Sequence, residues 1–310
     1  MQSFEVIYQN EARFLALTSL KPCEFDNLLS FFSPICEKYF EYHDVFGKKR
    51  KFQKFKEAQN SSLYGSSAKL FFILVCLKTN TLQELLGTLF DLSQGKVSQW
   101  LKVLLPLLHT SLKKADCMPA TTAAELYIRL LKVAEQEKII LHDAVERPVV
   151  RQTDKDNQED EYSGKAKNHT CKNELVVDTN RVIHFISPTV EGKTHDKTLC
   201  DDLQLKFPRG LALFQDLGYL GYKPQGVQEV FMPMKKTKNK KEFTEEEAAY
   251  NSFVSSVRIT VEHVIGAFQT LRIVREKIRM KGKLVRDVVA QTAAAIHNLR
   301  NYSRNPKFAT

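Results

Sequence analysis

Residues 138–148 read KIILHDAVERP, and they stand where the pattern of the chain changes. Before this stretch, apolar residues recur at helical spacing up to about residue 112, as in Phe25, Leu28, Leu29 and Phe32. From Lys138 onward, apolar runs are short and lie between polar turns, which is typical of strands. The stretch therefore predicts an α/β region that follows an all-helical region.

Four short strands and two long helices are expected after Lys138, with a shorter helix just before it. The strands fall at residues 139–141, 175–177, 182–186 and 211–214, and the helices at 123–137, 244–270 and 284–302. A capping box formed by Thr244 and Glu247 predicts the start of the helix at 244–270. Residues 151–172 are polar and densely charged, so we expect a mobile loop or a hairpin there.

The composition is that of a basic globular protein, with a formal net charge of +10 and a pI near 9.2. Residues 71–77 form the longest apolar run, far below the ~20 residues of a membrane span. Glu5 and Glu11 stand where a signal peptide would be basic and then apolar. The six cysteines include no C-x-x-C pair, which argues against a zinc site or a disulfide framework.

Lysines and arginines gather in three clusters, a distribution that favours a polyanionic partner over isolated solvated patches. The clusters are Lys48, Lys49, Arg50, Lys51, Lys54 and Lys56; Lys235, Lys236, Lys238, Lys240 and Lys241; and Arg272, Arg275, Lys277, Arg279, Lys281, Lys283 and Arg286.

Residues 81–105 fit a helix-turn-helix. Thr81 and Glu84 form a capping-box pattern for its first helix, and Ser93 can cap the second. Gly87 falls where the two helices must approach closely. The interior positions are all apolar: Leu86, Phe90, Leu92, Val97 and Trp100. The outward positions of the second helix can contact base edges and phosphates in a major groove, with plain helix packing as the alternative: Gln94, Lys96, Ser98 and Gln99.

Three carboxylates stand where nuclease chemistry would place them. Two-metal phosphodiester chemistry needs several carboxylates that converge on Mg²⁺ or Mn²⁺ ions. Asp143 ends the first strand, Asp216 follows the strand at 211–214, and Glu262 lies in the long helix after it. By spacing alone, other carboxylates qualify equally well: Asp178, Asp196, Asp201 and Asp202.

Five segments of the sequence carry information about the site that the spacing of the carboxylates does not. In this order they resemble the DDE-type insertion-sequence transposases, which share a nuclease domain with the eukaryotic Harbinger nucleases. The segments are residues 143–148 (DAVERP), 162–172 (YSGKAKNHTCK), 192–196 (GKTHD), 216–221 (DLGYLG) and 258–263 (RITVEH). Further similarity in residues 233–236, Asn251 and residues 268–279 extends the likeness from about Phe71 to Tyr302.

The resemblance implies a fold and a division of the chain. The expected fold is α/β, a ribonuclease H-like catalytic domain preceded by an all-helical helix-turn-helix domain. We expect residues 1–115 to form the helical DNA-binding domain, residues 116–137 a linker and helix, and residues 138–310 the nuclease domain.

The resemblance also implies the residues of the site. Asp143, Asp216 and Glu262 would be the catalytic metal ligands for two Mg²⁺ or Mn²⁺ ions, both aspartates holding both ions. Arg258 falls one helical turn before Glu262, so the two can face the same substrate phosphate. In related transposases a Tyr and a Lys often flank the Glu, whereas this chain has Ser255 and Gln269 at those positions. Further DNA contacts are expected from Lys235, Lys236 and Arg272.

The implied function is a DNA transposase that binds element ends, frees a 3′-hydroxyl by metal-dependent hydrolysis, and joins it to target DNA. Its partners would be double-stranded DNA and a second copy of the chain, with no membrane. The expected location is a bacterial cytoplasm, at the nucleoid, or a nucleus if the source is eukaryotic. Two rivals stay open: a DNA-binding regulator that has lost catalysis, and a metal-dependent endonuclease that cuts without joining.

Residues near the motifs have structural alternatives to a role in the site. We expect Thr194 to cap a helix whose first turn holds Asp196; the alternative is that His195 and Asp196 help to position substrate or metal. We expect His142 to face away from Asp143. Tyr219 and Tyr222 either stack on a base or pack in the core. Arg147 and Lys165 either hold the DNA backbone or form surface salt bridges.

Overall fold

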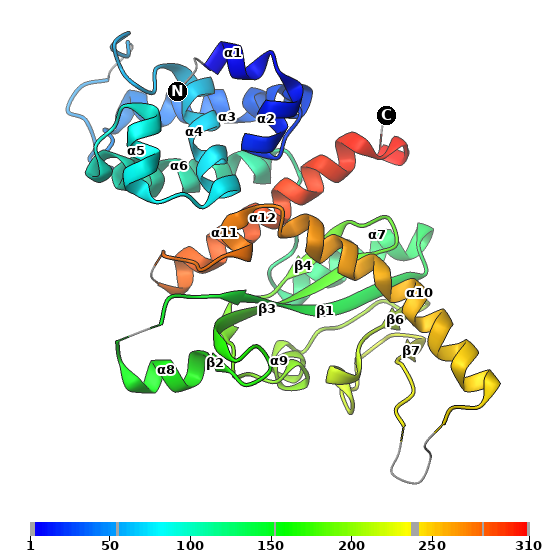
Figure 1. Ribbon diagram of the computed structural model, residues 1–310. Helices are drawn as coiled ribbons and strands as arrows, with labels where there is room; N and C mark the ends of the chain where they lie inside the picture. The colour runs from blue at the N-terminus through cyan, green and yellow to red at the C-terminus, as the bar shows by residue number, and fades with distance from the viewer. Residues whose placement is uncertain (1–3, 54–55, 152, 237–241, 281, 309–310) are drawn as a thin grey trace. The chain divides into compact units, whose positions relative to one another are not determined.

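A computed structural model describes residues 4–53, 56–151, 153–236, 242–280 and 282–308 (Figure 1). Five lysines of the basic clusters lie outside the described residues: Lys54, Lys238, Lys240, Lys241 and Lys281. No helix of the described segments is long and apolar enough to cross a membrane. All six cysteines are free thiols.

The chain forms two compact units, which differ from the division expected from the sequence. The first comprises Met1–Met118, Gln269–Glu276 and Leu284–Thr310, and the second comprises Pro119–Phe268 and Lys277–Lys283. Residues 269–276 and 284–310, expected in the nuclease domain, thus pack with the N-terminal helices. The contacts that hold them there include the Arg304–Glu24 pair, a hydrogen bond from Asn298 Nδ2 to the Cys117 carbonyl at 3.0 Å, and one from Lys78 Nζ to the Thr270 carbonyl at 2.8 Å.

The first unit is helical and has an aromatic core. The Phe14 ring packs edge-on against Phe25 at 5.2 Å and stacks on Phe71 at 5.7 Å. The helices are α1 (Phe4–Tyr8), α2 (Glu11–Thr18), α3 (Pro22–Tyr42), α4 (Gly65–Thr79), α5 (Gln83–Phe90), α6 (Gln94–Lys114), α11 (Arg272–Arg275), α12 (Lys283–Arg304) and the 3₁₀ turn η2 (Pro306–Phe308).

Helices α5 and α6 form the expected helix-turn-helix, with one error in its predicted start. A Cβ atom on Gly87 would lie 2.4 Å from the Leu92 carbonyl oxygen, so only glycine allows this approach. Ser93 caps α6 by accepting from the Lys96 N–H at 3.4 Å, as predicted. The capping box at Thr81 was wrong, because α5 begins one residue later with Leu82 as its N-cap and the Thr81 hydroxyl bonds Thr79.

The second unit is a mixed sheet with helices on both faces. Its strands are β1 (Ile139–Pro148), β2 (Tyr162–Ser163), β3 (Asn168–Asp178), β4 (Ile183–Ile186), β5 (Val190–Glu191), β6 (Ala212–Phe214) and β7 (Glu229–Phe231). Its helices are α7 (Ala123–Gln136), α8 (Lys155–Glu161), α9 (Asp196–Leu203), the 3₁₀ turn η1 (Leu217–Tyr219) and α10 (Glu245–Phe268).

The strand order of the sheet defines its fold. The long strand β3 pairs antiparallel with β1 on one side and with β4 on the other. Strand β1 pairs parallel with β6, which pairs parallel with β7. The order is therefore β4-β3-β1-β6-β7, three antiparallel strands followed by two that run parallel to β1. The fold is α/β and ribonuclease H-like, as the resemblance implied.

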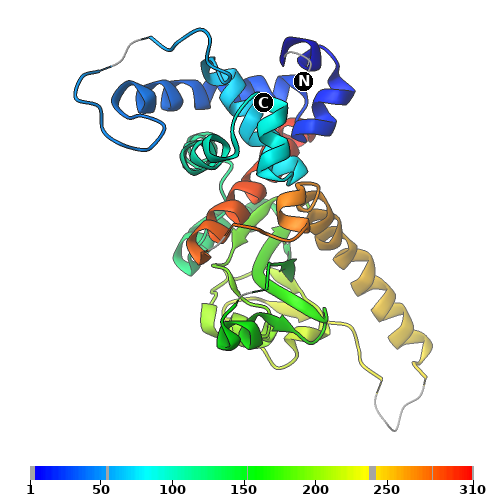
Figure 2. The same ribbon diagram turned by 60° about the vertical axis from the view of Figure 1, so that its left-hand side comes forward.

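Different helices cover the two faces of this sheet. On one face, Ile140 and Val176 pack with Leu130 of α7 in a buried cluster. On the other face, the ring of Phe253 from α10 lies 5.9 Å from that of Phe214 in β6. Figure 2 shows α10 passing the strands, with its N-terminal end, drawn in gold, extending beyond them. Successive residues of β1 therefore point alternately toward α7 and toward α10.

Strand β3 is much longer than the predicted strand at residues 175–177. It begins at Asn168, and its residues from Thr170 to Asp178 are all buried. Residues 151–172, expected as a loop or hairpin, contain α8 and then the β2–β3 hairpin, in which Ser163 pairs with Asn168.

Candidate active site

Asp143 and Asp216 lie side by side because of the register between β1 and β6. The parallel pairing sets Leu141 opposite Phe214, where β6 ends. Asp143 and Asp216 each follow this last pair by two residues, and both reach Arg258 of the helix α10. Asp143 points to the α10 face of the sheet, and its carboxylate Oδ1 accepts the Ala144 N–H at 2.9 Å.

Arg258 of α10 bridges the two aspartates. Its Nη1 lies 3.4 Å from Asp216 Oδ1 and its Nη2 lies 3.7 Å from Asp143 Oδ2. The side chains of Arg258, Asp143 and Asp216 are 13%, 22% and 44% exposed. One guanidinium is thus shared by two carboxylates, at distances longer than an ordinary hydrogen bond. Solvent reaches all three side chains.

Negative charge is in excess around Asp143. Partial burial, and after it the nearby negative charge of Glu174, raise the pKa of its carboxyl to about 6. The Arg258 cation and the Ala144 N–H act in the opposite direction without cancelling the shift. A further cation at this position would therefore relieve the electrostatic cost of ionised Asp143.

Glu262 lies on α10, one turn beyond Arg258, and is exposed. The spacing of four residues puts both side chains on the same side of the helix. Among the described residues, the structure joins Asp143, Asp216 and Arg258 by ion pairs and leaves Glu262 outside that group.

The donor set of this site fits a divalent metal ion. Carboxylate oxygens are the ligands that Mg²⁺ and Mn²⁺ prefer, and both aspartates keep oxygens that are incompletely neutralised. Nitrogen donors would favour zinc, but His142, the neighbour of Asp143 in sequence, points to the other face of the sheet and binds Glu174 there.

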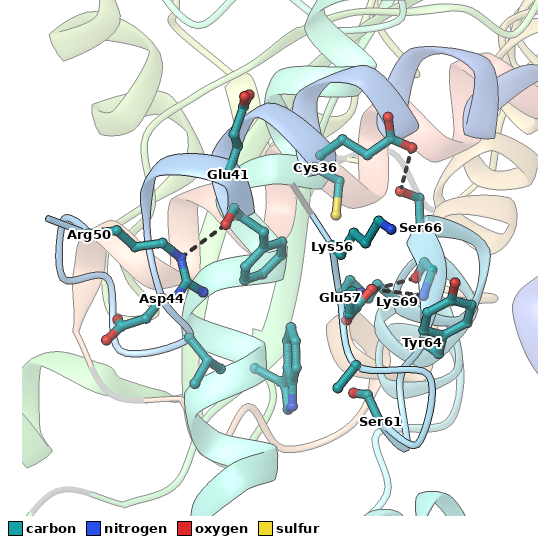
Figure 3. Close-up of a pocket in the computed structure, with 16 residues that line it drawn as sticks. Cys36, Glu41, Asp44, Arg50, Lys56, Glu57, Ser61, Tyr64, Ser66 and Lys69 are labelled. Carbon is teal, nitrogen blue, oxygen red and sulfur yellow. Dashed lines mark hydrogen bonds and ion pairs between the residues drawn. The ribbon is translucent and has the colours of Figure 1, made fainter. Parts of the chain in front are cut away.

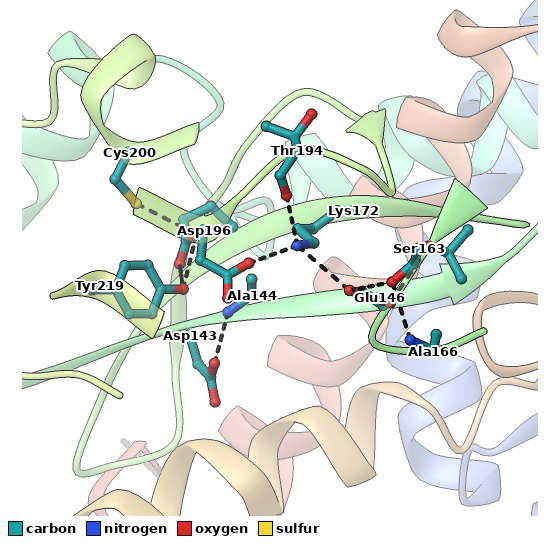
Figure 4. Close-up of polar contacts among 12 residues, drawn as sticks. Asp143, Ala144, Glu146, Ser163, Ala166, Lys172, Thr194, Asp196, Cys200 and Tyr219 are labelled. Atoms are coloured by element: carbon teal, nitrogen blue, oxygen red, sulfur yellow. Dashed lines mark hydrogen bonds and ion pairs between the residues drawn. The ribbon is translucent and has the colours of Figure 1, made fainter. Parts of the chain in front are cut away.

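On that other face lies a fully buried polar cluster, shown in Figure 4. The Glu174 carboxylate accepts from the Tyr219 hydroxyl at 2.8 Å and lies 2.8 Å from His142 Nε2. Cys200 Sγ lies 3.5 Å from the same carboxylate. The prediction that His142 faces away from Asp143 is therefore confirmed, and Tyr219 and Tyr222 pack in the core.

Lys172 organises a second group next to this cluster. Its ammonium donates to Asp196 Oδ1 at 2.7 Å and to the Thr194 carbonyl at 2.8 Å, and it pairs with Glu146 at 3.5 Å. The prediction that Thr194 caps α9 was wrong: His195 is the N-cap, and no side chain bonds the helix start. Thr194 instead offers its carbonyl to Lys172.

Arg147 has neither of the roles expected for it. Its side chain is fully buried and donates to Asn173 Oδ1 at 2.6 Å and to Thr189 Oγ1 at 3.0 Å. It thus ties β1 to β3 and to the chain after β4. Lys165 is exposed in the turn between β2 and β3.

The residues expected to contact DNA are not all equally accessible. Gln94 and Lys96 are exposed at the start of α6, whereas Ser98 and Gln99 are half-buried. Lys235 and Lys236 are exposed, and the Lys236 ammonium lies 5.3 Å from the centre of the Phe243 ring. Arg272 is exposed and pairs with Glu276.

A separate hollow of about 450 Å³ lies in the helical unit (Figure 3). The rings of Phe40 and Trp100 line it, and the Lys69 ammonium already sits 5.5 and 5.6 Å from their centres. Glu57 accepts from the same ammonium at 2.7 Å. The chain therefore fills this aromatic site with its own cation, and we assign the contact to folding.

Sequence reasoning missed Glu174, Cys200 and Lys172. Lys172 and Glu174 precede the apolar run of β3, and their polarity concealed that the strand continues through them. The signal for Lys172 was its place in the segment at residues 162–172 that carries the resemblance, because a lysine that becomes buried needs a charged or polar partner.

Comparisons with known proteins place the chain in a family. The sequence model described as "DDE superfamily endonuclease" matches residues 142–298, and the model described as "Helix-turn-helix of DDE superfamily endonuclease" matches residues 61–114. The chain therefore belongs to the DDE superfamily endonucleases.

The chain is also similar to a protein of Microchaete diplosiphon described as "Probable transposase for insertion sequence element IS702". The two are 33% identical over 154 residues, which cover 48% of this chain and 53% of that protein. The chain thus spans about half the length of the curated relative it matches. No solved structure matches the chain.

Proposed function

We propose that the chain is a DNA transposase that binds element ends, cuts them with divalent metal ions, and joins them to target DNA. The observation that carries the proposal is the meeting of Asp143 and Asp216 at one guanidinium, Arg258, on an accessible edge of the sheet. Membership of the DDE superfamily endonucleases and the helix-turn-helix support it.

In this proposal Asp143, Asp216 and Glu262 hold two Mg²⁺ or Mn²⁺ ions. When bound, such ions lower the pKa of a nucleophilic water and neutralise charge on the phosphate. Asp143 is held rigidly within β1, whereas Asp216 and Glu262 are exposed enough to adjust to the ions.

Arg258 binds and orients the substrate phosphate. Its guanidinium presents two N–H groups toward the aspartates at 3.4 and 3.7 Å, distances loose enough for it to turn toward an incoming phosphate. Planar guanidinium groups suit phosphate oxygens because they donate two parallel hydrogen bonds.

In this proposal the start of α6 reads the DNA sequence, through Gln94, Lys96, Ser98 and Gln99. Lys235, Lys236 and Arg272 contribute phosphate contacts, so affinity falls as salt rises. A homodimer on DNA brings the two element ends together.

The proposal is tested by nicking and strand transfer on a labelled duplex that carries the terminal sequence of the encoding element. Wild type is compared with Asp216→Asn and with Asp202→Asn, a matched change at an exposed carboxylate of α9. We expect Mg²⁺-dependent cutting and joining to vanish in Asp216→Asn, while DNA binding survives and Asp202→Asn behaves as wild type.

The other outcomes separate the rivals. Cut products without joined products would support a metal-dependent endonuclease. Binding without any metal-dependent cutting by the wild type would refute the enzyme and leave the DNA-binding regulator.

A further inference from the structure

The buried cluster behind Asp143 has a carboxylate at its centre. Glu174, His142, Cys200 and Tyr219 are all 0% exposed. The Tyr219 hydroxyl lies 2.8 and 3.0 Å from the two Glu174 oxygens, and His142 Nε2 lies 2.8 Å from Oε1. Each of the three neighbours offers a polar group to the same carboxylate.

A buried carboxylate such as Glu174 is a costly way to stabilise a fold. Moving a carboxylate out of water is expensive, and apolar residues of similar volume are often at least as stable as a buried ionic group. The Glu174 carboxylate is bonded in a specific geometry by Tyr219 and His142, which suits a device that fixes positions, while His142 Nδ1 is buried with no hydrogen-bond partner among the described residues.

The cluster reaches both chain segments that carry the aspartates. His142 immediately precedes Asp143 on β1, and Tyr219 follows Asp216 by three residues in the turn η1. One carboxylate from β3 therefore holds a neighbour of each aspartate. Figure 4 shows Asp143 pointing to the opposite side of the sheet from this group.

Asp216 depends on this support more than Asp143 does. Strand β6 has only three residues, and its pairing with β1 ends at Phe214. Beyond it, the backbone is held by the Gln215 N–H to the Phe231 carbonyl at 3.1 Å and by the Tyr219 N–H to the Asp216 carbonyl at 3.2 Å. The Tyr219 side chain is the anchor of this short turn.

We propose that Glu174 is a positioning residue: through Tyr219 and His142 it fixes the separation of Asp143 and Asp216, and thereby their affinity for a divalent metal ion. The inference rests on the proposed function, because it assigns the metal to these two aspartates. Residues that orient metal ligands from behind typically change metal affinity by about 10- to 100-fold when they are removed.

The test compares two tyrosines that lose the same atom. Tyr219→Phe removes the hydroxyl bonded to Glu174, whereas Tyr222→Phe removes a buried hydroxyl that has no hydrogen-bond partner among the described residues. Mn²⁺ binding to the DNA-free protein is measured by electron paramagnetic resonance. We expect about tenfold weaker binding in Tyr219→Phe and unchanged binding in Tyr222→Phe.

A second measurement links binding to the reaction. The Mn²⁺ concentration that gives half-maximal nicking should rise by the same factor in Tyr219→Phe, while DNA affinity without metal stays at the wild-type value. Thermal unfolding is recorded for each variant, because a purely structural role would lower the melting temperature and leave metal binding unchanged.

Equal Mn²⁺ affinity in Tyr219→Phe and Tyr222→Phe would overturn the inference and leave the proposed function standing. A wild type that neither binds Mn²⁺ nor cuts DNA would refute the proposed function, and the inference with it. Should Tyr219→Phe not fold, Glu174→Gln, which keeps the volume and one acceptor oxygen, is measured in the same way. Failure of both variants to fold would also overturn the inference, since the cluster would then serve the fold itself.

Discussion

The carboxylates on the two faces of strand β1 differ in their exposure to solvent and in how completely they are hydrogen-bonded. On the α10 face, Asp143 and Asp216 share one guanidinium at 3.7 and 3.4 Å and remain partly exposed. On the α7 face, the Glu174 carboxylate is sealed from solvent and bonded by several neighbours. Residues one position apart in sequence, His142 and Asp143, thus belong to different electrostatic environments.

The difference separates charges that maintain the fold from charges that await a ligand. A buried charge that has all its partners is expensive to disturb, because removing one partner leaves the others unsatisfied. A half-solvated charge with too few partners destabilises its surroundings, and such groups gather at functional sites. Substitutions on the two faces should therefore change stability by different amounts and in different directions.

The largest effect is expected at the sealed face. Glu174→Ala should lower the free energy of unfolding by about 3 to 5 kcal/mol, because His142 and Tyr219 lose their shared partner inside the protein. Asp216→Ala, at an exposed carboxylate, should change it by less than about 0.5 kcal/mol. Urea denaturation of the metal-free protein measures both, and equal losses would break the comparison.

A substitution of Lys172 tests whether removing one partner of a charged group is also costly where the group is less buried. Lys172→Met keeps the length of the side chain but leaves the Glu146 and Asp196 carboxylates facing each other without a cation. We expect a loss of about 2 kcal/mol, reduced by the partial exposure of both carboxylates. Lys165→Met, in the exposed turn, is the control and should be neutral in the same denaturation experiment.

Gly218 tests how firmly Lys172 holds Asp196. A Cβ atom at Gly218 would lie 2.9 Å from Asp196 Oδ2, and that carboxylate cannot move away without losing Lys172. Gly218→Ala should cost about 1.5 kcal/mol. In the background of Asp196→Ala the cost should nearly disappear, so a double-mutant cycle that gives purely additive values would contradict the contact.

The smallest effect has the opposite sign. Asp143→Asn removes a charge that burial and Glu174 both disfavour, so the metal-free protein should become more stable by about 1 kcal/mol. Asn keeps the shape of the side chain and an oxygen for the Ala144 N–H. Destabilisation by this change would show that Asp143 belongs with the fold-maintaining charges.

Much of the fold was predictable because apolar periodicity marks it. The helices at 123–137, 244–270 and 284–302 match α7, α10 and α12 within two residues, and Thr244 and Glu247 form the predicted capping box. Strands β2, β5 and β7 have two or three residues, too few for any period. The first half of β3 was hidden because its buried polar residues find partners only from segments distant in sequence.

The aspartates of the site needed more than their spacing. Asp178, an equal candidate by sequence, is buried and bonded to His184 at 2.9 Å, and Asp201 pairs with Lys197 on the same helix. Their local sequence does not distinguish them from Asp216, since the difference lies in which partners the fold delivers. The resemblance selected the two aspartates that the sheet register later placed side by side.

The helical unit is completed by two segments, residues 269–276 and 284–310, that follow the sheet in the chain. His109 of α6 bonds Gln291 of α12 at 3.0 Å, and Glu24 of α3 finds its arginine only at residue 304. During translation the sheet emerges in full before these partners exist, although domains generally fold in the order of synthesis. We therefore expect ribosome-bound or prematurely terminated chains to have an immature helix-turn-helix, so that truncated products compete poorly for DNA.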